Sequence, residues 1–457
     1  MNRSPLSRRR PRLLRLPWLA TAPPSPLPTA SPIHQLLLDC LSRVTDPATG
    51  ARLAQLPATD WRELVQVSAR HGVGPLLYDR LTTGAFPLPV PVGVMQTLRE
   101  AFLMNALRNT LLYQDLAQVL TALQQTGIRV AVLKGAHLAA LIYPHIGLRP
   151  MADMDLLVPE ADLPKADTLL RKIGYNTKSE PSFDVRSQVG KHLPEYLKPP
   201  HPRVEIHWTI APPELFYKVN PVRLIERLRP VTIAGVETHV LSPEDFVLHQ
   251  CIHLAVHRFC LHGLRPICDL AATLHHHREE LDWLQIQSRA AEWRAGKCVY
   301  VALRLASELM SAEVSPAALA TLRPESFAER WYTIAHEQVL LAGVESPPDD
   351  VELALSPAGA LAEGVTGTRL VGKVRFILRI AFPPRDHMVA YMAQFHSLPL
   401  TGHRQYTCYL TRACDWGGHG FRLLCYGATH RQETAVRARQ LQRQAQLWRW
   451  LTGPNFP

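Results

Sequence analysis

The stretch Met151-Ala152-Asp153-Met154-Asp155-Leu156-Leu157-Val158 decides how this chain folds. It places two carboxylates two positions apart at the start of an apolar run. Because successive strand side chains point to opposite faces, Asp153 and Asp155 are expected to share one face of a β-strand. Carboxylates this close repel each other and are costly to bury unpaired, so a bound cation such as Mg²⁺ is the expected compensation. The same pair also occurs on solvated strand edges, so the neighbouring segments must decide.

The segment before this strand predicts a phosphate-binding corner. Residues 127–143 read as a short β-run, a Lys134-Gly135 turn and then a helix. A glycine at such a corner lets a phosphate approach the backbone, the first N–H groups of a helix point at it, and a lysine adds a point charge. A Lys-Gly pair after a strand is weak support by itself.

The segment after the strand adds a third carboxylate. Residues 203–210 alternate, so that Glu205 and His207 share one face and Trp208 lies on the other, where we expect it to pack in the core. His207 is expected either to contact a phosphate or acceptor or to be the hydrogen-bond partner of an acid. Three acids from two strands, after a glycine corner, form a set that can hold two Mg²⁺ ions and a nucleoside triphosphate.

Taken together, these separated pieces resemble the nucleotidyltransferases of the DNA polymerase β type, and in particular an uncharacterised bacterial branch of that superfamily. The resemblance covers roughly residues 35 to 415. Its motifs are Leu133-Lys134-Gly135-Ala136, Tyr143-Pro144, Gly147-Leu148-Arg149-Pro150, the strand from Asp153 to Val158, Gly174-Tyr175 and Glu205-Ile206-His207-Trp208.

The resemblance implies a role for each acid. Asp153 and Asp155 would bind the metals, two Mg²⁺ ions with Mn²⁺ as an alternative, and Glu205 would be the third metal ligand and a base. The reaction implied is in-line attack of an acceptor oxygen on the α-phosphorus of a nucleoside triphosphate, ATP or CTP being expected, with release of pyrophosphate. The acceptor class stays open among a small molecule, a peptide, a protein and RNA.

The resemblance also implies a phosphate-binding group. It comprises Lys134, Gly135, Ala136, Arg149 and His207. The wider superfamily carries Gly-Ser or Gly-Gly where this chain has Gly135-Ala136, so a hydroxyl that could touch a phosphate is missing. Backbone N–H groups, Lys134 and Arg149 would have to compensate.

Two other functions stay open beside this one. The first is a catalytically silent relative that binds nucleotide as a regulatory protein, and the second is a basic RNA-binding protein whose acids are structural. The net charge of +11 favours the second, but arginines concentrated in the first 15 residues and after residue 404 supply much of it. No window reaches 18 apolar residues without charges and no export signal is recognised, so a cytoplasmic protein without a membrane partner is expected.

Cysteine and histidine usage predicts neither disulfides nor a zinc centre. Eight cysteines at irregular spacing in 457 residues do not form a disulfide framework. His253, His257 and Cys260 have the spacing i, i+4 and i+7 on one helical face, which can bind zinc. Because the stretch lacks an acid and is broadly apolar, a buried or groove-lining helix is preferred.

The fold expected is α+β, with a small mixed β-sheet nucleotidyltransferase core embedded in N-terminal and C-terminal helical regions. Within it we expect a helix over 161–173, a hairpin over 231–240 and a helix starting at Ser242-Pro243. An amphipathic helix over 434–451 is expected to pack rather than to enter a membrane. The expected regions are a disordered basic Pro-rich tail (1–32), an N-terminal helical region (33–126), the core (127–241), a helical domain (242–345) and a C-terminal helical extension with a basic end (346–457).

Overall fold

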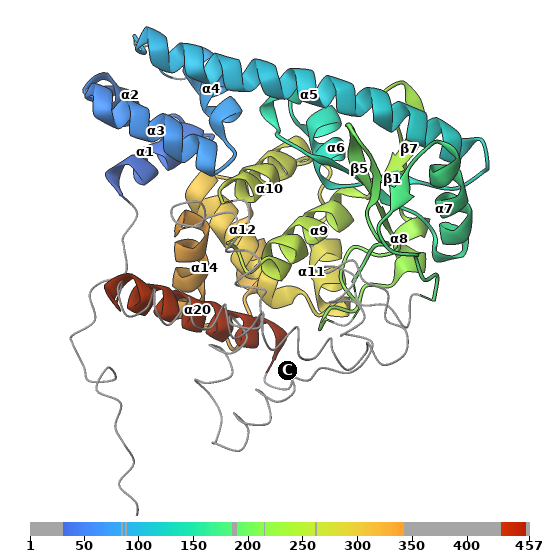
Figure 1. Cartoon of the computed structure of the whole chain (residues 1–457). Coiled ribbons are helices and arrows are strands. Elements are labelled where there is room, and N and C mark those ends of the chain that lie inside the picture. Colours follow the sequence, from blue (N-terminus) through green and yellow to red (C-terminus); the bar gives the residue numbers. More distant parts are fainter. Residues whose placement is uncertain are drawn as a thin grey trace, which may run out of the picture.

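The computed structural model describes residues 31–341, except 84–85, 87–88, 185–189, 214 and 261–262, together with residues 431–453. Figure 1 shows a sheet on one side of the molecule, a long helix along its upper edge and a body of helices beside it. The expected tail at 1–32 and most of the expected extension at 346–457 lie outside the described residues.

The described part of the chain opens with helices that lead up to the sheet. Their starts follow ordinary capping chemistry: the Ser31 hydroxyl accepts a hydrogen bond from the N–H of His34, and the Asp46 carboxylate accepts one from Ala48. The last of these helices has 33 residues and crosses the sheet (Figure 1). They are α1 (Pro32–Leu41), α2 (Pro47–Ala54), α3 (Ala58–Arg70), α4 (Gly74–Thr82) and α5 (Val92–Gln124).

Within the described residues, the strands form one seven-stranded mixed sheet in the order β3-β4-β5-β2-β1-β7-β6. The pairs β2/β5 and β1/β7 are parallel and the other neighbours are antiparallel. This confirms the small mixed sheet embedded in helices, including the hairpin formed by β6 and β7. The strands are β1 (Ala131–Val132), β2 (Asp153–Leu157), β3 (Asn176–Thr177), β4 (Tyr196–Lys198), β5 (His201–His207), β6 (Arg229–Ile233) and β7 (Val236–Val240).

The apolar face of β2 and β5 fixes which way their carboxylates point. Met154, Leu156, Val204 and Ile206 are all completely buried, in a core shared with α5 and with α7 (Leu163–Lys172). Burying a large apolar side chain contributes about 1.5–3 kcal/mol, and a slip of one residue would expose all four. The alternate residues of both strands are therefore held on the opposite face.

Of the helices that follow β5 in the chain, α9 (Pro243–Val256) and α10 (Arg265–His276) form the second wall of the site described below. The helix predicted from Ser242-Pro243 is present: the Ser242 hydroxyl accepts a hydrogen bond from the N–H of Asp245 at 3.3 Å. The other helices that follow β5 are α8 (Pro221–Glu226), α11 (Trp283–Glu292), α12 (Gly296–Met310), α13 (Pro316–Leu322), α14 (Glu329–Leu341) and α20 (Arg431–Thr452).

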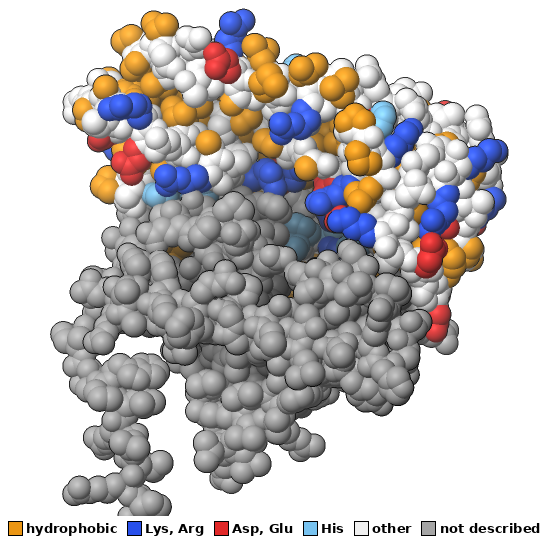
Figure 2. Space-filling view, viewed as in Figure 1, with side chains coloured by type: hydrophobic (Ala, Val, Ile, Leu, Met, Phe, Trp, Pro, Cys, Tyr) orange, Lys and Arg blue, Asp and Glu red, His pale blue; other side chains and the backbone are white. Residues whose placement is uncertain are grey.

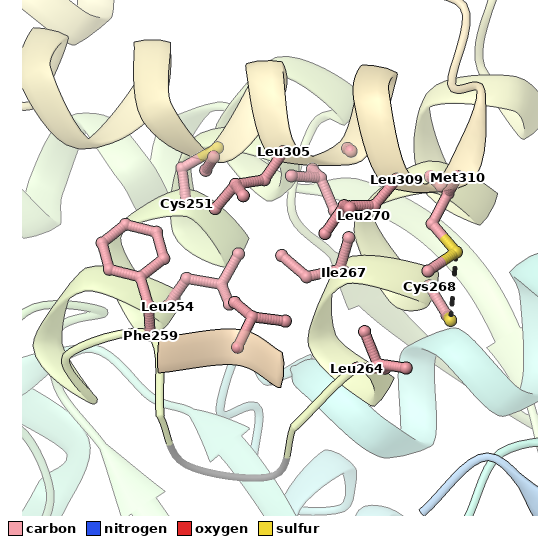
Figure 3. Close-up of a cluster of buried hydrophobic side chains, with 14 of the residues drawn as sticks. Cys251, Leu254, Phe259, Leu264, Ile267, Cys268, Leu270, Leu305, Leu309 and Met310 are labelled. Carbon is pink, nitrogen blue, oxygen red and sulfur yellow. Dashed lines mark hydrogen bonds between the residues drawn. The ribbon is translucent and has the colours of Figure 1, made fainter. Parts of the chain in front are cut away.

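An apolar core locks α9, α10 and α12 together (Figure 3). Cys251 and Leu254 from α9 meet Ile267 and Leu270 from α10, and all four are almost completely buried. The thiol of Cys268 lies 3.7 Å from the Met310 sulfur. Among the described cysteines, Cys40, Cys251, Cys260, Cys268 and Cys298 are free thiols. This packing gives α9 and α10 a fixed position relative to each other.

Two helices each have an apolar stripe, which is buried on α20 and exposed on α5. On α20, Ala445, Leu447 and Leu451 are buried and the helix packs on α14, which confirms the packing expected for 434–451. On α5, in contrast, a stripe stays exposed along the upper edge of the molecule in Figure 2; its large members are Leu103, Met104, Leu107 and Leu111. No helix among the described residues is long and apolar enough to cross a membrane.

Candidate active site

The centre of the site is a pair of carboxylates on adjacent parallel strands. The register of β2 and β5 places Asp155 directly opposite Glu205. One ligand atom from each of Asp155, Glu205 and His207 lies within 4.8 Å of the others, the one such group of three found among the described residues. Two carboxylates converging in this way form an oxygen-rich site of the kind that hard divalent cations prefer.

Asp153 occupies a different place from the other two acids. It pairs in register with Arg203, whose guanidinium donates a hydrogen bond of 3.0 Å to the Asp153 carboxylate. Its side chain is 27% exposed, whereas the Asp155 side chain is 3% exposed. Of the three acids predicted from the sequence, two therefore converge with His207, and Asp153 lies at the more open side.

Lys134 supplies the positive charge that balances these acids. Its ammonium group donates a hydrogen bond to Asp155 and lies 3.9 Å from the Glu205 carboxylate. Lys134 begins the one-turn helix α6 (Lys134–His137), which continues as a π-helical turn over Leu138–Ile142. Its backbone φ is +42°, a conformation that costs about 1–3 kcal/mol for a residue with a side chain. The expected strand, Lys-Gly turn and helix are present, but the α-helical part is a single turn.

The surroundings keep both carboxylates ionised. Burial opposes ionisation of Asp155, but the charge of Lys134 and the hydrogen bond from His207 outweigh it and hold its pKa well below the usual value. Burial likewise opposes ionisation of Glu205, and the hydrogen bond from His207 together with Lys134 leaves its pKa lowered. The pKa of Lys134 is raised despite burial, because Asp155 and Glu205 stabilise the ammonium form.

His207 is the hydrogen-bond partner of the acids. Its ring is completely buried, with Nε2 lying 2.8 Å from Asp155 and 3.3 Å from Glu205. A carboxylate only accepts hydrogen bonds, so Nε2 must carry a proton. Of the two roles considered for His207, the structure shows the bond to the acid; the ring is not among the residues that line the cavity described below.

Gly135 leaves room for Arg149. A Cβ atom at position 135 would lie 2.5 Å from an Arg149 guanidinium nitrogen. Arg149 in turn pairs with the Asp269 carboxylate at 3.0 Å. The loop that carries Arg149 is held by α5, because the Asn109 amide donates to the backbone carbonyls of Ile146 and Arg149.

Ala136 lies in the core and does not face the cavity. It is 1% exposed among the apolar residues under the sheet, and its carbonyl accepts a hydrogen bond of 2.7 Å from the Tyr113 hydroxyl. A serine at this position would therefore place its side chain in the apolar core and not in the cavity. The absence of serine here removes less from the site than the motif comparison suggests.

A cavity of about 340 Å³ opens beside the acids, between the sheet and α9 and α10. The sheet side contributes Asp153 and Asp155 together with Lys134, Arg149 and Arg203. Glu205 lies behind this lining. The α5 and helical-body side contributes Arg108, Phe246, His249, Gln250, His253, Arg265 and Asp269.

Sequence reasoning missed most of this helical wall. Four of its residues belong to no recognisable motif, because they lie on helices far from the acids in sequence. They are Arg108, His249, Gln250 and Arg265. One signal was present: His249 precedes His253 by four residues, and their rings are 6.4 Å apart on α9.

The helix that contains His253 ends before Cys260, the last residue of the spacing that could bind zinc. α9 ends at Val256, and Arg258 and Phe259 then adopt left-handed backbone conformations. Cys260 therefore lies outside the helical face that the spacing suggested, and its thiol donates to the backbone carbonyl of His257. His253 lines the cavity, which confirms the prediction of a groove-lining helix.

Comparison with known proteins identifies the family. No curated protein and no solved structure matches the chain. The model of a family described as uncharacterised nucleotidyltransferases matches residues 57–311, which is more than half of the chain and a narrower range than the 35 to 415 over which motifs resemble the superfamily. The matched range contains the sheet, the paired carboxylates and both walls of the cavity. The chain therefore belongs to this family of uncharacterised nucleotidyltransferases.

Proposed function

We propose that this nucleotidyltransferase moves a nucleoside monophosphate from a nucleoside triphosphate onto an acceptor hydroxyl in a Mg²⁺-dependent reaction. The observation that carries the proposal is the register of β2 with β5, which sets Asp155 beside Glu205 at the edge of a basic cavity. Membership of the family supports the reaction class. The chemistry of the site supports a bound metal ion and a triphosphate.

The residues present fit a divalent cation. The buried carboxylates of Asp155 and Glu205 converge, and Asp153 lies two residues before Asp155 on β2 and also lines the cavity. Their charge is matched in this structure by the Lys134 ammonium, and this supports the proposal that a cation is favoured at this position. When bound, Mg²⁺ would lower the pKa of the attacking hydroxyl and neutralise charge on the leaving pyrophosphate, and Mn²⁺ would be the alternative ion.

Basic side chains make the cavity suitable for a triphosphate. Arg149, Arg203 and Arg265 line it together with Lys134. Burial, reinforced by the neighbouring Arg149, lowers the pKa of Arg265 to about 10, which still leaves this guanidinium charged at neutral pH. Its Nε is buried and, among the described residues, has no hydrogen-bond partner. A phosphate oxygen would supply one.

The reaction balances without a further reactant. The acceptor oxygen forms a bond to the α-phosphorus, and the bond from that phosphorus to the α,β-bridging oxygen breaks, so that pyrophosphate leaves. The proton of the acceptor hydroxyl passes to Glu205, whose side chain is 11% exposed beside Asp155 and which the surrounding charges keep ionised at neutral pH. Lys134, once released from Asp155, would hold a phosphate oxygen.

The test follows the label of a triphosphate. The protein is incubated with Mg²⁺, a cell extract as the source of acceptor, and each nucleoside triphosphate labelled on either the α- or the γ-phosphate. Nucleotidyl transfer predicts an acceptor that carries α-label but no γ-label, with ATP and CTP as the expected donors. Transfer of γ-label, or binding of nucleotide without any transfer, would contradict the proposal and favour a kinase or a silent nucleotide-binding protein.

Matched variants complete the test. Asp153→Ala with Asp155→Ala should abolish both transfer and the rise in melting temperature caused by Mg²⁺ and nucleotide. Glu160→Gln removes an exposed acid that follows β2 and should leave both unchanged. For the RNA-binding alternative, RNA binding would persist in the double variant and weaken steeply as salt rises, without transfer.

A further inference from the structure

The helical wall of the cavity carries buried polar atoms that the protein itself does not satisfy. Among the described residues, both ring nitrogens of His249 and the amide oxygen of Gln250 are buried without a hydrogen-bond partner. Both residues lie on α9 and line the cavity that contains the acids. Leaving a buried donor or acceptor unpaired costs about 1–3 kcal/mol, so a cluster of such atoms beside a cavity indicates a place for a ligand.

His249 is the most deeply placed of these groups. His249 is 1% exposed, and the charges of Asp155 and Lys134 are close enough to influence its pKa. Burial, followed by the charges of Lys191 and Lys134, keeps the pKa of His249 well below the usual value. At neutral pH the ring is therefore uncharged and offers one N–H donor and one nitrogen acceptor.

The wall around His249 differs in chemistry from the sheet wall. Gln250 uses its amide N–H to donate to the Thr273 hydroxyl at 2.9 Å, which leaves its buried oxygen as an unpaired acceptor on a residue that lines the cavity. Phe246 lies behind this part of the lining: it is completely buried and stacked on the His137 ring at 4.0 Å. The α9 part of the wall is thus neutral and offers both a donor and acceptors, whereas the cations of the cavity lie on the sheet side and, as Arg108 and Arg265, on α5 and α10.

Such a division fits the two halves of a nucleotide. Phosphates need cations, while a nucleoside presents uncharged donors and acceptors on its hydroxyls and base edge and an apolar base face. We propose that His249 and Gln250 form the nucleoside subsite of this nucleotidyltransferase and hydrogen-bond the base or ribose of the bound triphosphate. This inference rests on the proposed function, because it takes the triphosphate to lie between the acids and the arginines.

The test compares ligands that share phosphates but differ in the nucleoside. Equilibrium binding is measured for Mg²⁺ with each of the four nucleoside triphosphates and for Mg²⁺ with inorganic tripolyphosphate. The variants are His249→Phe, which keeps a ring and removes both nitrogens, and His249→Leu, which also removes them and is smaller than phenylalanine. His34→Phe is the matched control, since His34 is also buried with an unpaired ring nitrogen but does not line the cavity.

We expect both His249 variants to bind the preferred nucleoside triphosphate about tenfold or more weakly, because a ligand group loses its partner in a buried site. Tripolyphosphate binding should stay unchanged, and the control should match wild type for both ligands. The free variants should be as stable as wild type, because the ring nitrogens have no partner within the described protein.

The opposing outcomes are separable. If nucleotide and tripolyphosphate affinities fall together, or if neither changes, the nucleoside subsite is elsewhere while the proposed function stands. If both His249 variants unfold, the ring is held by the protein and the inference is overturned. If the wild-type protein binds no nucleoside triphosphate with Mg²⁺, the proposed function fails, and the inference fails with it.

Discussion

Two pairs of buried carboxylates, Asp155 with Glu205 and Glu244 with Asp245, have opposite settings in this protein. All four residues are at most 8% exposed. Burying a carboxylate is costly unless it is paired, so each pair needs cations. The chemical nature of those cations, and what lies beside them, distinguishes the two regions.

The Glu244 and Asp245 pair is closed by arginines. The Arg227 guanidinium donates two hydrogen bonds, of 2.7 and 3.1 Å, to the Asp245 carboxylate. Arg289 donates hydrogen bonds of 3.0 Å to Asp245 and 3.5 Å to Glu244. These planar forks fix the start of α9 against α11, and neither acid lines the described cavity. Such a cluster is structural.

The Asp155 and Glu205 pair is instead balanced mainly by Lys134 and His207, beside a cavity. Arg203 and His192 approach Glu205 only at 3.8 and 3.9 Å. An ammonium group on a flexible stem makes no fixed fork and can exchange for another cation more easily than a guanidinium can. The comparison teaches that burial and charge alone do not distinguish the proposed catalytic acid pair from a structural one. The type of counter-ion and the adjoining space do.

The largest effect is expected at the acid pair itself. Asp155→Asn should reduce transfer of α-label by about a thousandfold or more, since it removes a charge worth several kcal/mol of transition-state stabilisation. The same change leaves the largely buried Lys134 with a weaker counter-charge. Adding Lys134→Met should recover stability measured by urea unfolding but should not recover transfer. Transfer near the wild-type rate in either variant would remove Asp155 from the mechanism.

The second effect is expected in the structural pair. Asp245→Ala leaves Arg227 and Arg289 without their main partner and should lower the free energy of unfolding by about 3–5 kcal/mol. At a temperature where the variant is folded, its affinity for Mg²⁺ and nucleotide should match wild type. A stable Asp245→Ala protein that has lost nucleotide binding would reverse the assignment of the two pairs.

Gly135 gives a smaller effect on the sheet wall. Gly135→Ala would force the Arg149 guanidinium away from its position against the backbone and should cost about 1–3 kcal/mol of stability. Nucleotide affinity should fall as well, because Arg149 lines the cavity. Gly93→Ala is the matched control, since a Cβ there meets nothing within 4 Å, and it should be neutral or slightly stabilising. Equal effects at the two glycines would contradict the close approach at Gly135.

The smallest effect concerns the pH dependence of stability, through buried histidines that include His249 of the cavity wall. Burial lowers the pKa of His71 to about 4 and of His137 to about 3, and that of His249 lies well below its usual value. The unfolded chain, whose histidines have pKa values of about 6.5, then binds more protons than the folded protein as pH falls below that value. Stability should therefore decrease on acidification, by about 1 kcal/mol for each such histidine at pH 6.

Melting temperatures between pH 7.5 and 5.5 check this prediction. The His249→Phe protein should lose less stability over that range than wild type, because one fewer buried neutral imidazole must be kept unprotonated. An equally steep profile in this variant, or a wild-type protein that gains stability on acidification, would contradict the placement of His249 as a buried neutral ring.

The sequence predicted what depends on local pattern. The alternation around Asp155 and around Glu205 placed both strands and their faces, and Ser242-Pro243 marked the start of α9. Two strands with one apolar face each must pair in a register that buries it, and this requirement is visible in the residues alone. The same reasoning expected Asp153 to join the metal group as closely as Asp155, but it had no means to see that Arg203 pairs with Asp153.

The rest depends on contacts between segments far apart in the chain. The cavity forms only where α9 and α10 meet the sheet, so His249 and Arg265 gain their position from the packing of helices about a hundred residues after Asp155. A helix that is apolar on several sides gives no periodic signal for which histidine faces a cavity. Likewise, Ala136 drew attention by its place in a motif, although its methyl group lies in the core.

The most direct measurement is Mn²⁺ binding followed by electron paramagnetic resonance, with nucleoside triphosphate present, in wild type and in single variants of the two acid pairs. The account predicts that Asp155→Asn abolishes the bound-ion signal, while Asp245→Asn, at a temperature where it is folded, retains it. A bound-ion signal that survives Asp155→Asn unchanged, or one that disappears only in Asp245→Asn, would contradict it.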